Sequence, residues 1–208
     1  MPDHYLTVAA EGEHETEVNR SRFLCALAPA ATEEDARRFI ERIRERHPTA
    51  SHHCYAYVIG ADASVRRAFD DGEPGGTAGQ PMLGMLLRRE VCHVVAVVTR
   101  WFGGTKLGAG GLIRAYGGAV GAALDAQGTV TRRRLRSALV TVDHGRAGRL
   151  ENELRALGHP VRSVTYGAEV TIALALPAAD LESFASWLAG ATAGAARLEP
   201  GDETVEAG

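Results

Sequence analysis

91-VCHVVAVVTRWFGGTKLGAGGLIRAYGGAVGAAL-124 is the stretch that decides the fold of the first half of the chain. Its long β-branched run over residues 91–102 predicts a buried central strand, and apolar residues at helical spacing over 112–124 predict a helix. The glycine-rich residues 103–111 predict a loop that joins the strand to the helix. Glycines inside this helix weaken it by up to ~1 kcal/mol each relative to alanine, so we expect its backbone to pack closely there. These glycines are Gly117, Gly118 and Gly121.

The rest of the first half predicts short strands and one well-marked helix. Thr32 is followed by three acids, which is the signal of a helix N-terminus, and the apolar spacing that follows ends at His47-Pro48. Glycines and prolines over residues 70–81 exclude regular structure there. Residues 1–134 are therefore predicted to form one α+β domain. Its other predicted elements are two strand runs within residues 4–30, a strand over 52–60 with a hairpin partner over 65–70, a short helix over 82–89, and a last strand and linker over 129–136.

Residues 135–208 predict a second α+β domain. The order of its elements is βαββαβ, which is the ferredoxin-like arrangement. The predicted elements are a strand over 137–142, a helix over 147–157, a hairpin whose strands meet at Gly167, a helix over 181–189 and a weaker strand over 196–205.

The composition is that of an ordinary soluble protein, with 45% hydrophobic and 24% charged residues. No apolar run approaches the ~20 residues that a membrane helix requires, and the N-terminus lacks a basic region followed by an apolar one. Cys25, Cys54 and Cys92 are odd in number and widely spaced, so we expect no disulfide framework. These features predict a cytoplasmic protein with no membrane partner.

The net charge of −3 hides an asymmetry between the two halves. Residues 1–134 carry 17 basic and 16 acidic groups, whereas the rest of the chain carries 6 and 10. Within residues 91–124 there are three basic side chains and no acid, which is a local field that favours an anion. Lys106 is moreover the only lysine among the 23 basic residues. In an arginine-rich chain this favours a role for the compact ammonium group, with chance as the alternative.

The strand–glycine loop–helix unit is the strongest signal for a binding site. Backbone amides at a helix N-terminus lack intrahelical partners and carry partial positive charge, and glycines let a ligand approach them. The spacing matches neither a Walker A loop nor a dinucleotide fingerprint, and the alternative is that the glycines only permit tight strand–helix packing, with Trp101 and Phe102 in the core. The predicted anion-binding residues are Arg100, Gly103, Gly104, Lys106, Gly108, Gly110, Gly111 and Arg114.

A second loop, residues 70–79, combines three carboxylates with a glycine run and one hydroxyl. Such acids can hold Mg²⁺ or act as a general base, and they can equally form turns. We expect Lys106 near the mouth of a cleft where the two loops meet. If Asp70 or Asp71 faces it there, the pair would keep the empty site neutral and could exchange its carboxylate for a ligand phosphate. The candidate residues of this loop are Asp70, Asp71, Glu73, Gly76, Thr77 and Gly79.

The remaining histidines and cysteines do not predict a metal site. His52, His53 and Cys54 are neighbours, but alternate residues of a strand point to opposite faces, and no second pair stands at ligand spacing. His93 lies in the apolar run and is predicted to be a core histidine.

Four segments together resemble the IMPACT family. The family's bacterial members have two domains, and the resemblance is strong over residues 18–125 and extends to their C-terminal domain over the βαββαβ tail. The segments are SRFLCALAP (21–29), HPTASHHCYAY (47–57), DDGEPGGTAGQP (70–81) and, most specifically, VVAVVTRWFGGTKLGAGGLIRAYGGAV (94–120).

This resemblance implies the fold and a broad role. It implies an N-terminal domain like the second domain of a small-subunit ribosomal protein and a C-terminal domain like the last one of elongation factor G. Likeness to a ribosome-binding factor implies work on RNA or the translation apparatus. Eukaryotic relatives add an RWD domain and restrain a translation-control kinase. This sequence begins without that domain, so we do not extend the kinase role to it.

Two functional hypotheses follow. The favoured one is a non-enzymatic regulator without a cofactor, which binds RNA or ribosomal phosphate through the 100–114 segment. Its acidic second domain would contribute orientation or a contact with a protein partner. The alternative is an enzyme acting on a small molecule or phosphate ester, with Mg²⁺ held by Asp70, Asp71 or Glu73 opposite Lys106. The sequence leaves the ligand, any reaction and the oligomeric state open.

Overall fold

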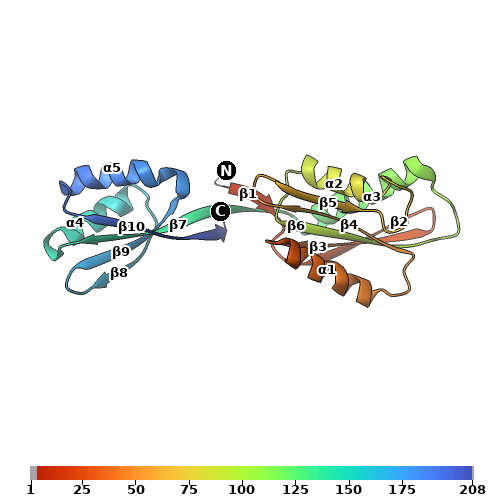
Figure 1. Cartoon of the computed structure of the whole chain (residues 1–208), viewed down its shortest axis with the longest axis horizontal. Coiled ribbons are helices and arrows are strands. Elements are labelled where there is room, and N and C mark those ends of the chain that lie inside the picture. Colours follow the sequence, from red (N-terminus) through yellow and green to blue (C-terminus); the bar gives the residue numbers. More distant parts are fainter. Residues whose placement is uncertain (1–3, 208) are drawn as a thin grey trace. The chain divides into compact units, whose positions relative to one another are not determined.

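The computed structural model describes residues 4–207, and the chain divides into two compact units, residues 1–131 and 132–208 (Figure 1). Both units mix helices with antiparallel sheets, which confirms the predicted α+β class. Within residues 4–207, no helix is long and apolar enough to cross a membrane.

The first unit contains a five-stranded antiparallel sheet with the predicted apolar strand at its centre. From one edge to the other, the strands are β2 (Gly12–Val18), β3 (Ser21–Pro29), β6 (Val94–Trp101), β4 (His52–Ile59) and β5 (Val65–Phe69). A short strand, β1 (His4–Thr7), precedes them and forms a bridge from Leu6 to Val91.

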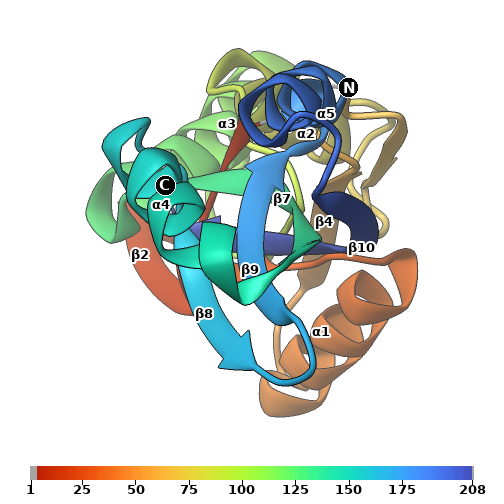
Figure 2. The ribbon, with the colours of Figure 1, turned by 90° about the vertical axis from the view of Figure 1, so that its left-hand side faces the viewer.

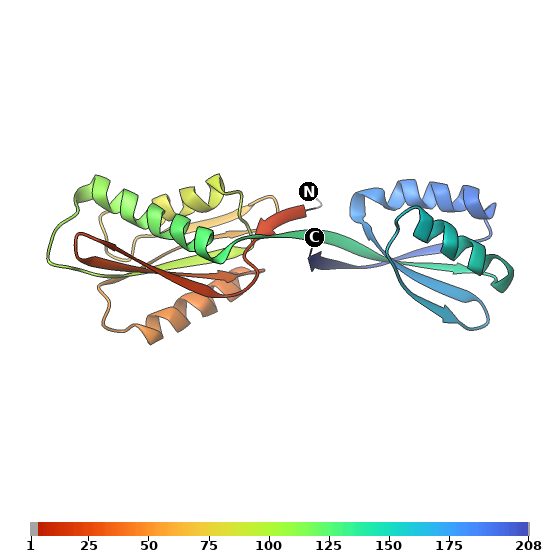
Figure 3. The same ribbon diagram turned by 180° about the vertical axis from the view of Figure 1, so that it is seen from behind.

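Helices cover both faces of this sheet, which explains the continuous apolar run of β6. Val94, Ala96 and Val98 belong to the core under α2 (Gly79–Arg88) and α3 (Gly108–Gln127). Val95 and Val97 belong to the core under α1 (Glu33–Arg46). Figure 1 shows α1 on one side of the sheet and the other two helices on the opposite side, and Figure 3 shows the long helix α3 from behind. A strand buried on both faces has no polar side to alternate with.

The start of α1 follows the sequence prediction closely. Thr32 Oγ1 accepts a hydrogen bond from the Asp35 N–H, and the Asp35 carboxylate accepts one from the Thr32 N–H at 2.9 Å. This reciprocal capping box satisfies two backbone donors that have no intrahelical partner. The helix ends before His47, as predicted.

Several element boundaries differ from the prediction. β6 begins at Val94 and not at residue 91, because His93 has a φ of +50°, which interrupts an extended strand. His93 is therefore not inside the strand, and its half-buried ring packs against the ring of Tyr5 with 4.7 Å between centroids. Residues 4–30 form three strands, not two, and β7 (Val130–Val142) is one strand where two were predicted.

Both site helices begin earlier than predicted. α2 begins at Gly79 instead of residue 82, and α3 begins at Gly108 instead of residue 112. Glycine and proline are tolerated in a first helical turn because its N–H groups lack intrahelical partners in any case. The second half of the predicted glycine loop is therefore the first turn of α3.

The glycines inside α3 lie mostly against α2. A Cβ added at Gly117 would lie 3.4 Å from the Pro81 carbonyl oxygen, and one added at Gly121 would lie 3.1 Å from Met85 Cε. A Cβ at Gly118 would meet no atom within 4 Å. Close packing thus accounts for two of the three glycines, and Gly118 has no such explanation.

The second unit has the predicted ferredoxin-like fold, and Figure 2 shows it facing the viewer. Its strands lie in the order β10-β7-β9-β8, and neighbouring strands are antiparallel. Both helices contribute to its apolar core, through Leu150 and Leu154 and through Phe184 and Leu188. The elements after β7 are α4 (His144–Ala156), β8 (Val161–Tyr166), β9 (Val170–Pro177), a short 3-10 helix (Ala178–Asp180), α5 (Leu181–Thr192) and β10 (Arg197–Ala207).

Candidate functional site

A buried ion pair joins the two glycine-rich segments. Glu73 Oε1 accepts hydrogen bonds from Arg100 Nη1 at 2.5 Å and from the Tyr116 hydroxyl at 2.6 Å. The Glu73 and Arg100 side chains are only 4% and 6% exposed. Burial, together with Cys54 and the acceptor Glu73, raises the pKa of Tyr116, so its hydroxyl stays a donor. Arg100 and Glu73, both predicted ligand-binding residues, therefore bind each other.

Arg100 also organises the end of β6. Its guanidinium contacts two aromatic rings, at 5.4 Å from the centroid of Phe23 and 5.7 Å from that of Phe102. Its Nη2 donates to Ser21 Oγ at 3.4 Å, and the same hydroxyl accepts from the Gly103 N–H at 3.2 Å. The start of the second glycine loop is thus attached to the same buried cluster.

Asp70 holds the first glycine loop and caps α2. Its carboxylate accepts hydrogen bonds from the N–H groups of Gly76 at 2.8 Å, Ala78 at 3.0 Å and Gly79 at 2.8 Å. Burial opposes the charge, but these three backbone donors outweigh it and lower the pKa of Asp70. Asp70, which lies eight residues before Ala78 and nine before Gly79, thus satisfies free N–H groups at the start of this helix.

Asp71 is also engaged, and among residues 4–207 neither Asp70 nor Asp71 forms an ion pair with Lys106. The Asp71 carboxylate accepts from Arg44 Nη2 at 2.9 Å and from the His53 N–H at 2.6 Å. Thr77, the hydroxyl of this loop, is buried and donates to the Pro74 carbonyl at 2.6 Å. In the part of the chain that the structure describes, no group of three or more His, Cys, Asp or Glu residues is arranged to hold a metal ion.

The second glycine loop is tight at one end and open at the other. A Cβ at Gly103 would lie 2.0 Å from the backbone of Arg20, so only glycine fits there. Gly104 and Gly108 have φ values of +86° and +69°, and a Cβ at either would meet no atom within 4 Å. The loop therefore turns close to β3 at its start and then runs along open surface.

The open end of this loop carries the free cations. Leu107, the N-cap residue of α3, makes no capping hydrogen bond with its side chain, and among residues 4–207 no side-chain acceptor is found on the amides of Gly108, Gly110 and Gly111. Lys106 and Arg114 are exposed, and among residues 4–207 neither forms an ion pair within 4.0 Å. This surface keeps the properties that the sequence predicted for an anion site.

Three contributors to this region were not identified as site residues from the sequence. Tyr116 shows apolar helical spacing, and only its hydroxyl, which needs a partner when buried, hinted at a polar role. Ser21 gives no local signal. Phe102 was assigned to the core in the packing interpretation, but it is 51% exposed.

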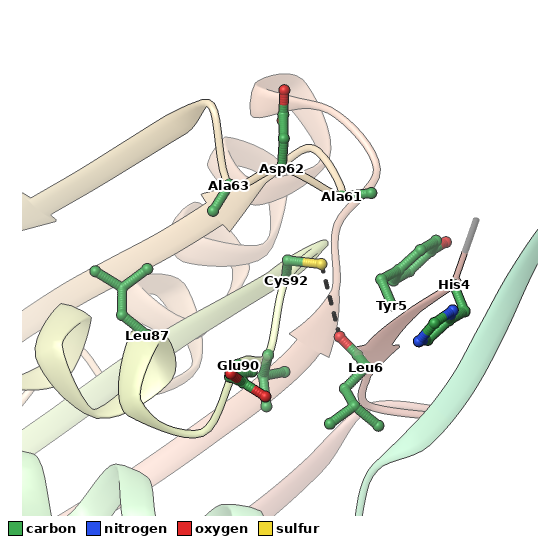
Figure 4. A pocket seen from close by; sticks show the side chains of 10 residues that line it. His4, Tyr5, Leu6, Ala61, Asp62, Ala63, Leu87, Glu90 and Cys92 are labelled. Atoms are coloured by element: carbon green, nitrogen blue, oxygen red, sulfur yellow. Dashed lines mark hydrogen bonds between the residues drawn. The ribbon is translucent and has the colours of Figure 1, made fainter. Parts of the chain in front are cut away.

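A separate hollow lies at the opposite end of β6. It has a volume of about 480 Å³ and is lined by residues that include Tyr5, Asp62, Glu90 and Cys92 (Figure 4). The Cys92 thiol donates to the Leu6 carbonyl at 3.7 Å. None of the predicted site residues lines this hollow or a second one beside Phe39.

Comparison with known proteins places both loops in a recognised domain. Residues 19–124 match the Impact N-terminal domain. The chain is also 42% identical to the IMPACT family member YvyE of Bacillus subtilis (strain 168), over 98% of this chain and 94% of that protein. This chain belongs to the IMPACT family. The whole buried cluster of this IMPACT family member, from Ser21 to Tyr116, lies inside the matched domain.

Further comparisons match the second unit of this IMPACT family member and add bacterial and eukaryotic relatives. Residues 140–195 match a domain of unknown function (DUF1949). The IMPACT family member YigZ of Escherichia coli (strain K12) is 38% identical over 94% of this chain and 97% of its own. The crystal structure of an hypothetical protein is similar to this chain, with a TM-score of 0.65 and 36% identity over 95% of this chain and 97% of that one. Protein IMPACT of Xenopus laevis is 33% identical over 43% of this chain and 30% of its own.

Proposed function

We propose that this IMPACT family member is a regulator associated with translation, which binds RNA or ribosomal phosphate through the start of α3. The observation that carries the proposal is that, among residues 4–207, the N-terminus of α3 has no side-chain cap and the exposed cations Lys106, two residues before the helix, and Arg114, within it, have no ion-pair partner. Free amides and full positive charges together favour a phosphate. Residues 91–124 contain no acid, and Glu90 and Asp125 flank the segment.

The family relationship supports the biological setting. The resemblance implies a role in translation for the eukaryotic relatives, and the domain shared with them contains the proposed phosphate site. The acidic second unit would then offer a protein contact rather than a second RNA surface, because it carries 10 acidic and 6 basic groups over residues 135–208.

The metal-dependent alternative has less support. Asp70, Asp71 and Glu73, the carboxylates it requires, accept hydrogen bonds from backbone amides, Arg44, Arg100 and Tyr116. A metal would have to displace several of these donors. A thermal-shift screen of nucleotides with Mg²⁺ against short RNA oligomers separates the two hypotheses, because a ligand that binds the native state raises its stability. A large rise in melting temperature with a nucleotide but not with RNA would favour the metal-dependent alternative over RNA binding.

Ribosome co-sedimentation tests the proposal directly. We expect association at low salt that falls steeply as salt rises, because several phosphate counterions would be released. The Lys106→Ala/Arg114→Ala variant should lose this association, and Arg37→Ala, which removes an exposed cation from α1, should keep it. Absence of ribosome and RNA binding at low salt would contradict the proposal.

A further inference from the structure

We propose that the site takes single-stranded RNA and that Phe102 is the platform on which an unpaired base stacks. This inference rests on the proposed function, because it names the class of RNA for the same surface. Phe102 follows β6 directly and precedes the loop that carries Lys106. An aromatic ring beside free cations is the combination used to bind single strands, with stacking for the bases and positive charge for the phosphates.

The ring of Phe102 is exposed but held in place. It is 51% exposed, although it follows a strand in which Val94 to Val98 are completely buried. The Arg100 guanidinium lies 5.7 Å from its ring centroid, and the Phe102 N–H donates to Ser51 Oγ at 3.2 Å. A buried hydrogen bond of 2.5 Å from Arg100 Nη1 to Glu73 Oε1 holds Arg100. A ring supported from within loses little freedom when a base stacks on its solvent side.

Two other aromatic residues of the first unit fit the role less well. The Trp101 ring is already covered by the Arg22 guanidinium, 3.8 Å from its centroid, and His47 lies against it edge-on. Phe69 is 47% exposed, but its ring stacks on that of Tyr55 with 5.3 Å between centroids. Phe69 also comes directly before Asp70 and Asp71 in the sequence. A phosphate backbone would avoid those carboxylates.

The chemistry favours a single strand over a duplex. The bases of a duplex are stacked on one another, so a protein ring can reach a base face only where the strand is unpaired. Residues 102–114 contain one exposed aromatic ring, two exposed cations and the first amides of α3. This set suits one splayed base with its flanking phosphates.

The test separates base stacking from phosphate binding. Fluorescence anisotropy is measured with an unstructured RNA of about ten nucleotides, with an abasic oligomer of the same length and with the matching RNA duplex. The proteins are the wild-type chain, Phe102→Ala, Phe102→Leu, Lys106→Ala and the matched control Phe69→Ala. Thermal unfolding of each variant shows that it is folded, and Phe102→Leu keeps an apolar side chain in case the smaller one unfolds the loop.

We expect the wild-type chain to bind the single strand about tenfold more tightly than the abasic oligomer. Phe102→Ala and Phe102→Leu should remove this preference without changing the salt dependence, and Phe69→Ala should keep it. Lys106→Ala should weaken binding of both oligomers and reduce the salt slope by about 1.

Different failures have different meanings. The stacking inference is overturned, and phosphate binding stays in place, under one set of results. The wild-type chain would bind single-stranded, abasic and duplex oligomers equally, Phe102→Ala would not change the affinity, and Lys106→Ala would weaken it. Loss of the preference in Phe69→Ala as well would also overturn it, because the effect would not be specific to Phe102. Binding of none of the oligomers overturns both proposals and leaves the exposed ring to a protein contact.

Discussion

Glu73 Oε1 accepts a hydrogen bond from Arg100 Nη1 at 2.5 Å, and this buried pair attaches the 70–79 loop to the end of β6. Removing one partner of such a pair leaves an uncompensated charge in the interior. We expect Glu73→Ala to destabilise the first unit by about 3–5 kcal/mol, measured by urea unfolding.

The control for this prediction is an exposed ion pair in the same unit. Arg89 and Asp125 lie 2.7 Å apart, with side chains 47% and 62% exposed. Asp125→Ala should cost at most about 1 kcal/mol, because solvent screens the pair. Equal effects of the two substitutions would mean that the Glu73 pair is not desolvated.

Asp70 should give the unfolding free energy an acid-dependent component. Its folded-state pKa is lowered by the backbone donors, so its contribution is complete above the unfolded-state pKa of ~3.9 and is lost as the pH falls through the lower folded-state value. Asp70→Ala should cost about 1–2 kcal/mol at neutral pH, as for other helix caps. The difference from the wild type should shrink below about pH 4. A difference that stays constant into strong acid would show that the charge of Asp70 is not involved.

Alanine substitutions of glycines should raise or lower the stability of the protein according to the space available for the added Cβ. Gly118→Ala adds a methyl group to open surface on α3 and should stabilise the protein by about 0.5–1 kcal/mol. Gly103→Ala would place a Cβ 2.0 Å from the Arg20 backbone, so the variant should be strongly destabilised. Differential scanning calorimetry checks both directions. A stable Gly103→Ala protein would mean that the loop does not approach β3 so closely.

The three cysteines should be unreactive in the folded protein. All are free and buried, and burial raises the pKa of Cys54 to about 12 and that of Cys92 to about 11, and raises the pKa of Cys25 further still. A thiol reagent at about pH 8 needs the thiolate, so we expect no rapid reaction in buffer and three equivalents after unfolding in guanidinium. Rapid native-state labelling of any cysteine would indicate local opening around it.

Lys106→Ala should affect binding and leave stability unchanged. The side chain is exposed and has no ion-pair partner among the described residues, so its removal breaks no contact that supports the fold. Loss of a charge-assisted hydrogen bond to phosphate should weaken RNA or ribosome binding by about 1–3 kcal/mol. Arg37→Ala provides the matched loss of charge on α1, which covers the other face of the sheet. Equal effects of both variants would mean that only the net charge matters.

The sequence by itself determined the elements whose signals are local. The apolar run of β6, the capping box at Thr32 and Asp35, and the βαββαβ order of the second unit all appear in the structure as predicted. The reason is that periodicity, caps and turns depend on residues within a few positions of one another. The same locality allowed the exposed, uncapped start of α3 to be singled out as a candidate anion site.

The tertiary structure alone decided which of the candidate side chains are free. Glu73 is 27 residues from Arg100 and 43 from Tyr116 in sequence, and its pairing with them takes both Glu73 and Arg100 out of the ligand surface. Asp70 caps a helix for a similar reason, since the folded loop brings three N–H groups to its carboxylate. Phe102 is exposed because β6 ends one residue before it, where the sheet no longer covers the ring. Partners and exposure depend on the packing of distant segments, and no local pattern of residues encodes them.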